Sequence, residues 1–565
     1  MHSDDGDQAP GGPGGEARWT SSAKSGVGTA IGGRVWFTLS HGILNEVYYP
    51  RVDQACVRDL GLIVTDHAGR FFSEEKRHAR HQVAGLADGV PAYRLTNTCD
   101  AERYRIDKEV VADPRREVVL QRITFTALQG ATADYAVYAL LAPHLGNAGA
   151  DNTGWVGDYK GRQFLFAERH GVALALACSS GWGARSVGFV GSSDGWQQLR
   201  QHGALTPQHQ RAAHGNIALT GQLDLTASDR VELALGFGRT WAEAAHRASA
   251  SLLDGFDVAA AAYRQGWGQW QVGLRPPPPG LPRTHALYRA STAVLRTHAS
   301  ARFPGALVAS LSVPWGASKG DGDLGGYHLV WPRDLVESAG GLLAIGADDE
   351  VRRVLTYLAV TQEADGHWPQ NMWIDGTPYW HGIQMDETGF PILLVDLARR
   401  RGVLDDAALA QLWPMVRRAA QFIITNGPVT QQDRWEEDPG YAPFTLAVEI
   451  AALLAAADLA RVLEPRLVDD LHATADAWND AIERWTYVTG TALAGQVGVD
   501  GYYVRVAAPG TPTPRRPRAA SCRSRTGRRA KTARRPRTWS APTRSRWCSS
   551  GCALPTTPAW SPPPR

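Results

Sequence analysis

A proline-rich segment at residues 274–283 divides the sequence into two parts that must fold differently. It reads LRPPPPGLPR, and its four consecutive prolines fix the backbone φ angle and lack amide donors. Neither a helix nor a central strand can run through such a stretch, which forms a stiff, extended connector. The residue pattern also changes here, so we predict two domains of different class on either side of it.

The first part, residues 35–238, consists of short runs rich in Val, Thr, Tyr and Phe, separated by Gly, Asp and Asn. Such runs are typical of β-strands, and many strands with close turns and little helix predict an antiparallel sandwich. A helical, Ala-rich pattern over residues 239–270 then leads to the connector. The clearest strands are expected at residues 118–126, 135–141, 172–178, 216–225 and 231–237.

The second part carries apolar residues at helical spacing, interrupted by loops rich in Gly, Trp and Asp. Alternating long and short connections indicate an array of helical hairpins. The long loops would then gather on one face, where a functional site can form. Seven helices are expected, at residues 284–299, 334–345, 349–361, 388–401, 405–426, 441–463 and 466–487.

Residues 511–565 resemble neither part, because they hold 13 Arg, one Lys and no acidic residue. Removing these 14 basic residues from the 59 leaves 45 against 56 acidic ones, so the rest of the chain has a net charge of −11. The favoured interpretation is an out-of-frame translation of GC-rich coding sequence. The alternative is a basic arm that binds nucleic acid. Either way the segment is expected to be disordered.

Cysteine content and the N-terminus favour a soluble, cytoplasmic protein. Cys56, Cys99 and Cys178 are scattered through the body without zinc spacing, which suits a reducing compartment. The acidic, Gly/Pro-rich N-terminal residues lack the basic start and apolar run of a secretory signal. The most apolar stretch, residues 450–457, is far shorter than the roughly 20 residues that span a bilayer. We expect no cofactor, no metal, and no membrane partner.

Three loop segments of the helical part combine aromatic rings with carboxylates and Arg. This mixture suits sugars, because aromatic faces cover the C–H surface of a pyranose while Asp and Arg bind its hydroxyls. Glycoside hydrolysis also needs two carboxyl groups, and Glu436 or Glu437 could supply the acid, with a pKa raised by the neighbouring charge and the cover of Trp435. The segments are YHLVWPRD at 327–334, WIDGTPYWHGIQMDE at 373–387 and DRWEED at 433–438.

Each segment taken alone also has a structural interpretation. WEED followed by Pro-Gly is commonly a solvated loop before a helix cap, and WPRD can be a helix start with Pro332 in the first turn and Asp334 near the N-terminus. The aromatic residues of WIDGTPYW could simply pack. His328 and His381 lack metal-ligand spacing. The order and spacing of all three segments together favour the functional interpretation.

In this order the motifs resemble the glucoamylase family, glycoside hydrolase family 15, in its bacterial two-domain form that includes glucodextranases. The block at residues 22–64 is similar to the start of the β-sandwich of the bacterial members, and the resemblance covers about residues 17–508. It implies Glu436 as general acid, Glu437 as a supporting carboxylate, and a set of substrate-binding residues in the three motifs. These are Tyr327, Trp331, Arg333, Asp334, Trp380, Gln384 and Trp435.

The resemblance implies a super-sandwich followed by an (α/α)6 barrel that releases β-glucose from non-reducing ends of α-glucans or gluco-oligosaccharides by inversion. Family members continue for roughly another 150 to 200 residues, and their catalytic base lies there. No Glu follows Glu483 in this chain. We therefore expect an incomplete barrel with little or no hydrolase activity that tends to aggregate.

The expected organisation has five segments. A disordered lead-in occupies residues 1–16, the β-sandwich with its C-terminal helical segment 17–272, the linker 273–283, the partial catalytic barrel 284–508, and the tail 509–565. Two other functions stay open from sequence alone: a glycoside phosphorylase, which would use phosphate in place of activated water, and a glucan-binding protein without catalysis. A nucleic-acid role would rest only on the tail, and we expect none.

Overall fold

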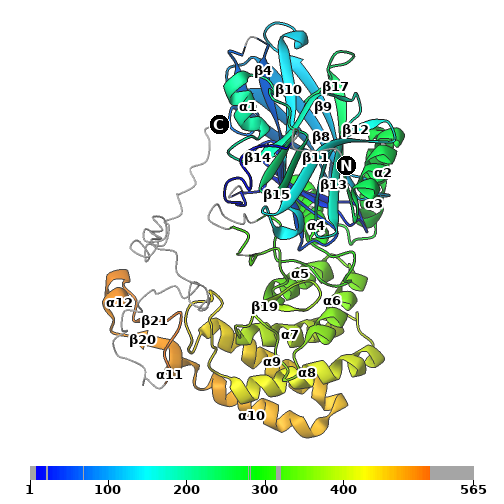
Figure 1. The fold of residues 1–565 in the computed structure, drawn as a ribbon. Helices are drawn as coiled ribbons and strands as arrows, with labels where there is room; N and C mark the ends of the chain where they lie inside the picture. Colours follow the sequence, from blue (N-terminus) through cyan, green and yellow to red (C-terminus); the bar gives the residue numbers. More distant parts are fainter. Residues whose placement is uncertain are drawn as a thin grey trace, which may run out of the picture.

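The fold is given by a computed structural model that describes residues 8–20, 23–67, 69–277, 279, 282–312, 320–322 and 324–509. Figure 1 shows a β-rich body followed along the chain by a helical body, with α4 and α5 where the two meet. The lead-in at residues 1–7 and the tail from residue 510 lie outside the described residues. Among the helices that are described, none is long and apolar enough to cross a membrane.

Two antiparallel sheets build the β-rich body, which confirms the predicted sandwich. The first sheet runs, in spatial order, β1 (Gly26–Thr29), β2 (Trp36–Ser40), β3 (Ile43–Tyr48), β4 (Ala55–Asp66), β10 (Tyr135–Pro143), β16 (Ile217–Leu223) and β14 (Trp182–Phe189), with β5 (Phe72–Glu74) beside β4. The second runs β15 (Arg211–Gly215), β11 (Asn152–Tyr159), β12 (Arg162–Arg169), β13 (Val172–Cys178), β17 (Arg230–Gly238), β9 (Val118–Ala127), β8 (Tyr104–Ala112), β7 (Val90–Cys99) and β6 (Ala79–Ala87).

Helices cover the outer face of the second sheet. α2 (Trp241–Asp254) packs on β17 and β13, and α3 (Phe256–Val272) packs on β8. Gly236 of β17 permits the close approach of α2, because a Cβ there would lie 2.4 Å from the carbonyl oxygen of Ala244. Gly255 separates α2 from α3 with a φ of +84°, so the predicted helical segment is two helices. α1 (Gly195–His202) lies against β14 and β16.

The helical body is an arc of hairpins, as the sequence predicts. α5 (Pro332–Ala344), α7 (Met385–Arg400) and α9 (Pro443–Leu463) pack side by side as an inner row. α6 (Asp348–Thr361), α8 (Asp406–Asn426) and α10 (Val468–Asn479) lie behind them, one behind each inner helix. All three inner helices therefore begin at the same end of the arc, and the long loops that precede them meet there.

The sequence of α9 explains its place in the inner row. It reads PFTLAVEIAALLAAADLARVL, and apolar residues occupy almost its whole circumference. A helix that is apolar all round must be covered on most sides, and α7, α8 and α10 do this. The outer helix α6, by contrast, starts with three acidic residues and buries only one face.

Smaller elements complete the described chain. α4 (Pro282–Thr297) begins inside the predicted linker and packs on β7 and β1. Beyond α10, the single helix predicted at residues 466–487 is interrupted at Asp480 and Ala481, and continues as α11 (Ile482–Thr486). The rest are η1 (Thr132–Asp134), η2 (Leu145–Asn147), β18 (Asn371–Met372), β19 (Pro378–Trp380), η3 (Pro465–Leu467), β20 (Tyr487–Thr489), α12 (Ala492–Val497) and β21 (Gly501–Tyr503).

The predicted disordered lead-in is wrong for residues 8–16, which lie against the sandwich. The amide of Ala9 donates to the carbonyl of Arg211 at 2.7 Å, and that of Gly15 donates to Val190 at 2.8 Å. Ala9 is buried in the first core. The Gly/Pro-rich composition suggested disorder, but this segment gains its order from backbone pairing with distant residues near β14 and β15, which composition does not reveal.

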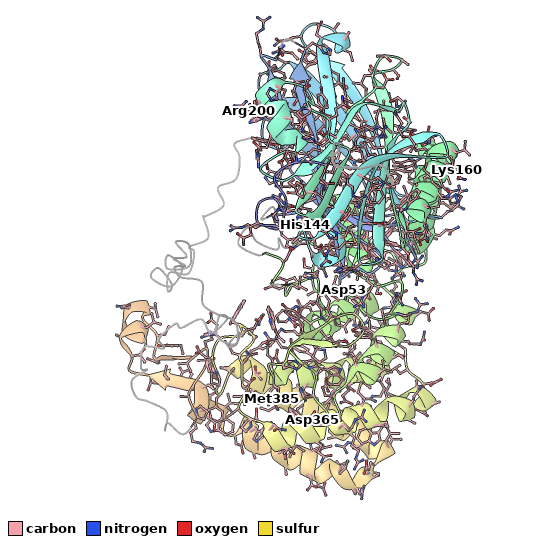
Figure 2. All side chains as sticks on the ribbon, in the orientation of Figure 1. Asp53, His144, Lys160, Arg200, Asp365 and Met385 are labelled. Carbon is pink, nitrogen blue, oxygen red and sulfur yellow. The ribbon has the colours of Figure 1, made fainter. Side chains whose placement is uncertain are left out.

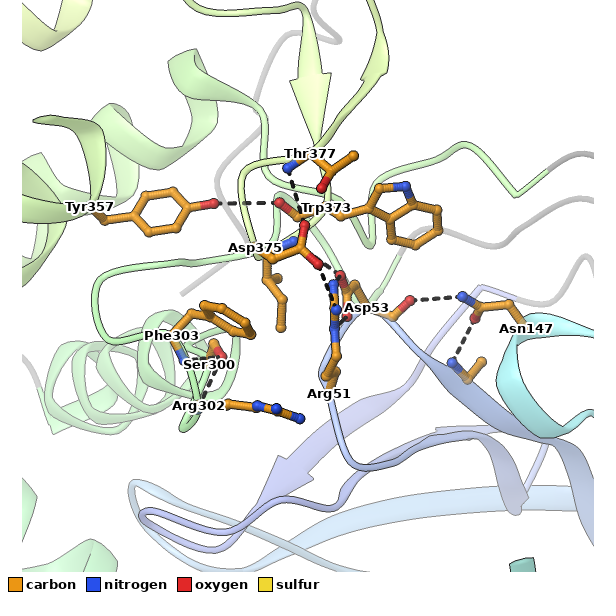
Figure 3. Close-up of polar contacts among 12 residues, drawn as sticks. Arg51, Asp53, Asn147, Ser300, Arg302, Phe303, Tyr357, Trp373, Asp375 and Thr377 are labelled. Carbon is orange, nitrogen blue, oxygen red and sulfur yellow. Dashed lines mark hydrogen bonds and ion pairs between the residues drawn. The ribbon is translucent and has the colours of Figure 1, made fainter. Parts of the chain in front are cut away.

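A polar cluster joins the two bodies at Asp53, which lies at their junction (Figure 2). Arg51 binds Asp53 with Nε and Nη2, at 2.9 and 2.7 Å, and reaches Asp375 of the helical body with Nη1 at 2.7 Å. The Asp53 carboxylate also accepts the amide of Ile374 at 3.0 Å, and the Asn147 side chain donates to the Asp53 carbonyl and accepts the amide of Ala55 (Figure 3). The sandwich thus fixes the turn at residues 373–377, which leads into β19.

We propose that residues 17–272 form a domain that folds on its own. Of the described side chains buried in the sandwich core, only Ala9 and Ala293 lie outside this range. A chain of about 250 residues is ample for an independent core. Expressed alone, this fragment is expected to melt in one cooperative transition, measured by circular dichroism.

The fragment also exposes apolar residues that belong to the second core, among them Trp19 and Trp36. A variant with both replaced by Ser is the matched control, and it is expected to aggregate less than the parent fragment. A broad, non-cooperative melt of both fragments would show that the domain assignment is wrong.

Candidate active site

The first site segment ends at the start of α5. Trp331 is the extended residue before the helix, and Pro332 occupies the first helical position, where its missing amide costs no hydrogen bond. Arg333 and Asp334 follow in the first turn. Asp334 sits where the helix dipole favours negative charge. This start places both charged side chains at the end of the arc where the long loops gather.

The second segment ends in the same way at the start of α7. Gln384 is the extended residue before the helix, and Asp386 and Glu387 lie in the first turn. All three side chains are fully buried and face Arg333 of α5. Arg333 Nη1 donates to Gln384 Oε1 at 2.9 Å and to Asp386 Oδ2 at 2.5 Å, and Nη2 donates to Gln384 Oε1 at 2.7 Å. Nη2 also lies 3.4 Å from Glu387 Oε1.

The third segment is a tight loop before α9. Its ends pair through Thr430 and Gly440, whose backbones exchange hydrogen bonds of 3.1 and 3.0 Å. Inside it, the backbone carbonyl of Asp433 accepts the amide of Glu436 at 2.8 Å, and its side chain accepts the amide of Glu437 at 3.0 Å. Glu436 has a φ of +63°, a conformation that residues with a side chain seldom adopt. Strain of this kind often marks a functional position.

Aromatic rings from the first two segments stand beside these charges. Trp331 is buried and stacks on Tyr327 with ring centroids 5.9 Å apart, and Trp380 meets Trp331 edge to face at 5.8 Å. Tyr327 is 46% exposed and Trp435 62% exposed, so both rings are accessible from solvent. Exposed rings beside buried carboxylates are suited to stacking on a sugar.

Burial shapes the titration of the site. It raises the pKa of Glu436, Asp334 and Asp386, and it raises the pKa of Glu387 well above its ordinary value. For Glu436 the charge of Arg333 and a hydrogen bond with Gln370 act in the opposite direction. Burial alone would lower the pKa of Arg333, but the charges of Glu387 and Asp386 outweigh it and raise that pKa. Arg333 therefore stays charged while the carboxyl groups around it compete for protons.

The structure brings most of the predicted site residues together. Asp334 and Arg333 of α5 and Glu387 of α7 lie close enough to Glu436 to shift its titration or to be shifted by it. Tyr327 also responds to the charge of Glu436. The Gln384 side chain is fully buried and its Oε1 accepts from both Nη groups of Arg333, and its part in substrate binding stays a prediction. Glu437 turns toward Arg505, which lies 3.2 Å away.

Sequence reasoning missed four side chains that hold the site. Asp386 and Glu387 end the WIDGTPYWHGIQMDE segment but were not predicted as site residues, and their place in the first turn of a helix was the available signal. Gln370 hydrogen-bonds Glu436 from a loop with no motif of its own. Arg505 contacts the third segment from far along the sequence, and no local pattern points to it. No group of three metal-ligating side chains occurs among the residues that the structure describes.

Comparisons with known proteins decide the family. Residues 9–272 match the family described as Glucodextranase, domain N, and residues 363–509 match Glycosyl hydrolases family 15. The sequence is 37% identical to a glucoamylase of Clostridium sp. (strain G0005) over 507 residues, which are 89% of this chain and 69% of that protein. The chain belongs to glycoside hydrolase family 15.

A solved structure shares the fold. It is a bacterial glucoamylase in complex with acarbose, with a TM-score of 0.83 and 36% identity over 88% of this chain and 72% of that one. An uncharacterised glycosyl hydrolase of Methanocaldococcus jannaschii is 26% identical over 142 residues, 25% of this chain and 23% of the relative. The family resemblance and the order of sandwich and helical hairpins are therefore confirmed.

Proposed function

We propose that this family 15 chain is an exo-acting α-glucosidic hydrolase of the glucan 1,4-alpha-glucosidase or glucodextranase type, which releases glucose from non-reducing ends with inversion. The observation that carries the proposal is the buried Arg333 between Asp334 and the carboxylates of α7, with Glu436 beside it. The relatives named glucoamylase support the substrate class. The cytoplasmic location stays a prediction.

In this proposal Arg333 and Asp334 bind the hydroxyls of the terminal glucose. Arg333 suits this role because its Nη groups are fixed from behind by Gln384 and Asp386, so its remaining N–H bonds point in set directions. The aromatic rings provide the apolar surface for the sugar faces. The substrate-binding set is Tyr327, Trp331, Arg333, Asp334, Trp380 and Trp435, with Gln384 holding Arg333.

Glu436 is the proposed general acid. Its pKa is raised mainly by burial, so a proton stays on the carboxyl group at higher pH than on an exposed Glu. That proton passes to the glycosidic oxygen as the bond to glucose breaks. Glu437 is given no part in this step, because its carboxylate forms an ion pair with Arg505 at 3.2 Å. Glu437 thus supports the loop as a charged partner.

Inversion also requires a carboxylate that activates water on the opposite sugar face, about 6.5–9.5 Å from the acid. The last acidic residue of the sequence is Asp500, so residues 501–565 supply no such group. The predicted weak activity of the 565-residue chain rests on this observation. The same observation favours a second function, the binding of glucan ends without their hydrolysis.

Binding and turnover are tested together on the full 565-residue chain. Calorimetry is expected to show that maltotetraose binds, while chromatography detects little released glucose. In a second assay, azide replaces water as the nucleophile and α-glucosyl fluoride replaces the glucan as the substrate. The C1–F bond breaks as a C1–N bond forms on the opposite face, and fluoride leaves with the proton of Glu436, which solvent restores.

The expected product is β-glucosyl azide, and Glu436→Gln is expected to form it at least about 10-fold more slowly. If the chain releases glucose from maltotetraose and Glu436→Gln abolishes this release, Glu436 remains the assigned acid. The predicted lack of a base would then be wrong. Formation of glucose 1-phosphate on addition of inorganic phosphate would indicate a phosphorylase. Absence of any maltotetraose binding would contradict the proposed function.

A further inference from the structure

The segment around β21 returns to the acid-bearing loop and contacts it with a single cation. Arg505 Nη2 lies 2.7 Å from Asp438 Oδ2, and Nη1 lies 3.2 Å from Glu437 Oε2. Nη1 also hydrogen-bonds Asp433 Oδ2. Arg505 thus binds all three acidic residues of the DRWEED motif other than Glu436. No cation other than Arg505 forms an ion pair with these three among the described residues.

Backbone contacts hold Arg505 in place over the loop. Tyr441 and Ala507 exchange two hydrogen bonds, of 2.8 and 2.9 Å, directly beside the loop end. Tyr441 also stacks on Trp485 with ring centroids 4.6 Å apart. At Gly440 a Cβ would lie 2.3 Å from the Ala507 carbonyl oxygen, so the two strands of chain approach as closely as glycine permits. Loop and segment therefore form one packed unit.

Asp433 transmits the position of Arg505 to Glu436. Its side chain is buried, with Oδ1 accepting the amide of Glu437 and Oδ2 accepting from Arg505. Its carbonyl accepts the amide of Glu436, whose φ of +63° is the strained point of the loop. A left-handed residue persists only where its surroundings determine it. Arg505 stabilises the buried Asp433 charge that makes this turn.

We propose that Arg505 is a positioning residue for the general acid: it neutralises Asp433, Glu437 and Asp438 and locks the strained turn that presents Glu436 to the sugar. The proposal rests on the role of Glu436 given above. Among the described residues, Arg505 forms its ion pairs with Asp433, Glu437 and Asp438, and none with Glu436 or the acids around Arg333. Its effect on the reaction passes through the loop, both as geometry and as charge.

The charge effect has a definite sign. Glu436 faces Arg333 and Asp334 of α5, Glu387 of α7, Tyr327 of the first segment, and Asp433 of its own loop. The Asp433 charge already raises the pKa of Glu436. Removing Arg505 leaves three acidic groups without their cation, so the pKa of Glu436 must rise further.

Isofagomine, a glucose-shaped amine that stays protonated in acid, reports this change through its affinity for the full chain. It binds best when Glu436 is ionised, so its affinity falls as the pH drops through the pKa of Glu436. In Arg505→Ala the fall is expected to begin at a higher pH, and the affinity is expected to be about 10- to 100-fold weaker at its optimum. Arg505→Lys keeps the charge and is expected to keep the wild-type midpoint with an intermediate affinity.

Arg484→Ala is the matched control, because Arg484 is an exposed Arg of the neighbouring α11 and forms no ion pair with a described residue. It is expected to match the wild type. Glu436→Gln shows whether Glu436 is the titrating group, because the isofagomine affinity of this variant should lack the fall at low pH, which is the step compared between variants. If the wild type also lacks the step, the acid assignment fails. If the step is present and Arg505→Ala leaves both midpoint and affinity unchanged, the positioning role of Arg505 is overturned.

Discussion

Arg333→Ala is expected to weaken maltotetraose binding by more than about 100-fold and to lower the free energy of unfolding by roughly 3–5 kcal/mol. Arg333 is 8% exposed and is the shared partner of Gln384, Asp386 and Glu387. Its removal leaves a buried amide oxygen and two buried carboxyl groups without their donor. The stability loss comes from these stranded groups, and the affinity loss from the missing contacts to the sugar.

The pH separates the two effects of Arg333→Ala. As the pH falls, Asp386 and Glu387 take up protons, because burial raises the pKa of both groups. Neutral carboxyl groups no longer need a cation, so the difference in unfolding free energy between variant and wild type should shrink in acid. The binding defect should persist, since protonation of the carboxyl groups does not replace the guanidinium donors.

Denaturant titration and calorimetry at two pH values measure both quantities. Arg466→Ala is the control, because Arg466 is 76% exposed at the side chain and its ion pair with Glu464 lies at the surface. An exposed pair of this kind contributes at most about 1 kcal/mol. Equal affinities of wild type and Arg333→Ala for maltotetraose would show that Arg333 holds helices together without binding sugar.

Local patterns in the sequence predicted the elements well. The strand expected at residues 172–178 is β13 without any shift, and the helix expected at 405–426 begins one residue later as α8. In these elements the apolar residues recur with a clear period, and the same residues face the core in the folded chain. The helix expected at 466–487 breaks at Asp480 and Ala481, where the apolar spacing continues but the chain turns toward β20.

The site was predictable as far as each residue acts through its own segment. Pro332 and Asp334 have the positions in α5 that their sequence signals indicate. The partners of Arg333 could not be predicted, because Asp386 lies 53 residues away and meets it only when α5 and α7 pack side by side. Arg505 is 72 residues from Asp433 and reaches it through a return of the chain that no periodicity encodes. Long-range pairing of charges is thus what the sequence leaves open.

Glu449→Gln is expected to make the protein more stable than the wild type at pH 8 and equally stable near pH 4.5. Glu449 lies on α9, and neither of its side-chain oxygens has a hydrogen-bond partner among the described residues. Burial, and then the charge of Asp386, raise the pKa of Glu449 to about 8. In the unfolded chain this carboxyl group ionises with an ordinary Glu pKa near ~4.3.

The direction of the pH dependence follows from these two values. Below the unfolded pKa the group is protonated in both states, so it does not oppose folding. Between that pH and about 8 the unfolded state releases its proton while the folded state keeps it, so the wild type loses stability as the pH rises. The loss reaches at most about 5 kcal/mol, and the Glu449→Gln variant should show none of it, because an amide at this position cannot ionise.

Urea denaturation at pH 4.5, 6 and 8 measures this difference, with Asp476→Asn as control. Asp476 is an exposed acid of α10, so its conversion to an amide removes a charge without emptying a buried site. Parallel stability curves for wild type and Glu449→Gln would mean that Glu449 is ionised in the folded state. That result would also argue against the Arg333–Asp386 ion pair. A second buried charge beside Asp386 would raise the pKa of Asp386, and a protonated Asp386 is no longer the anion that holds Arg333. A neutral Glu449 leaves that anion in place, which connects the stability of α9 to the geometry of the proposed sugar site.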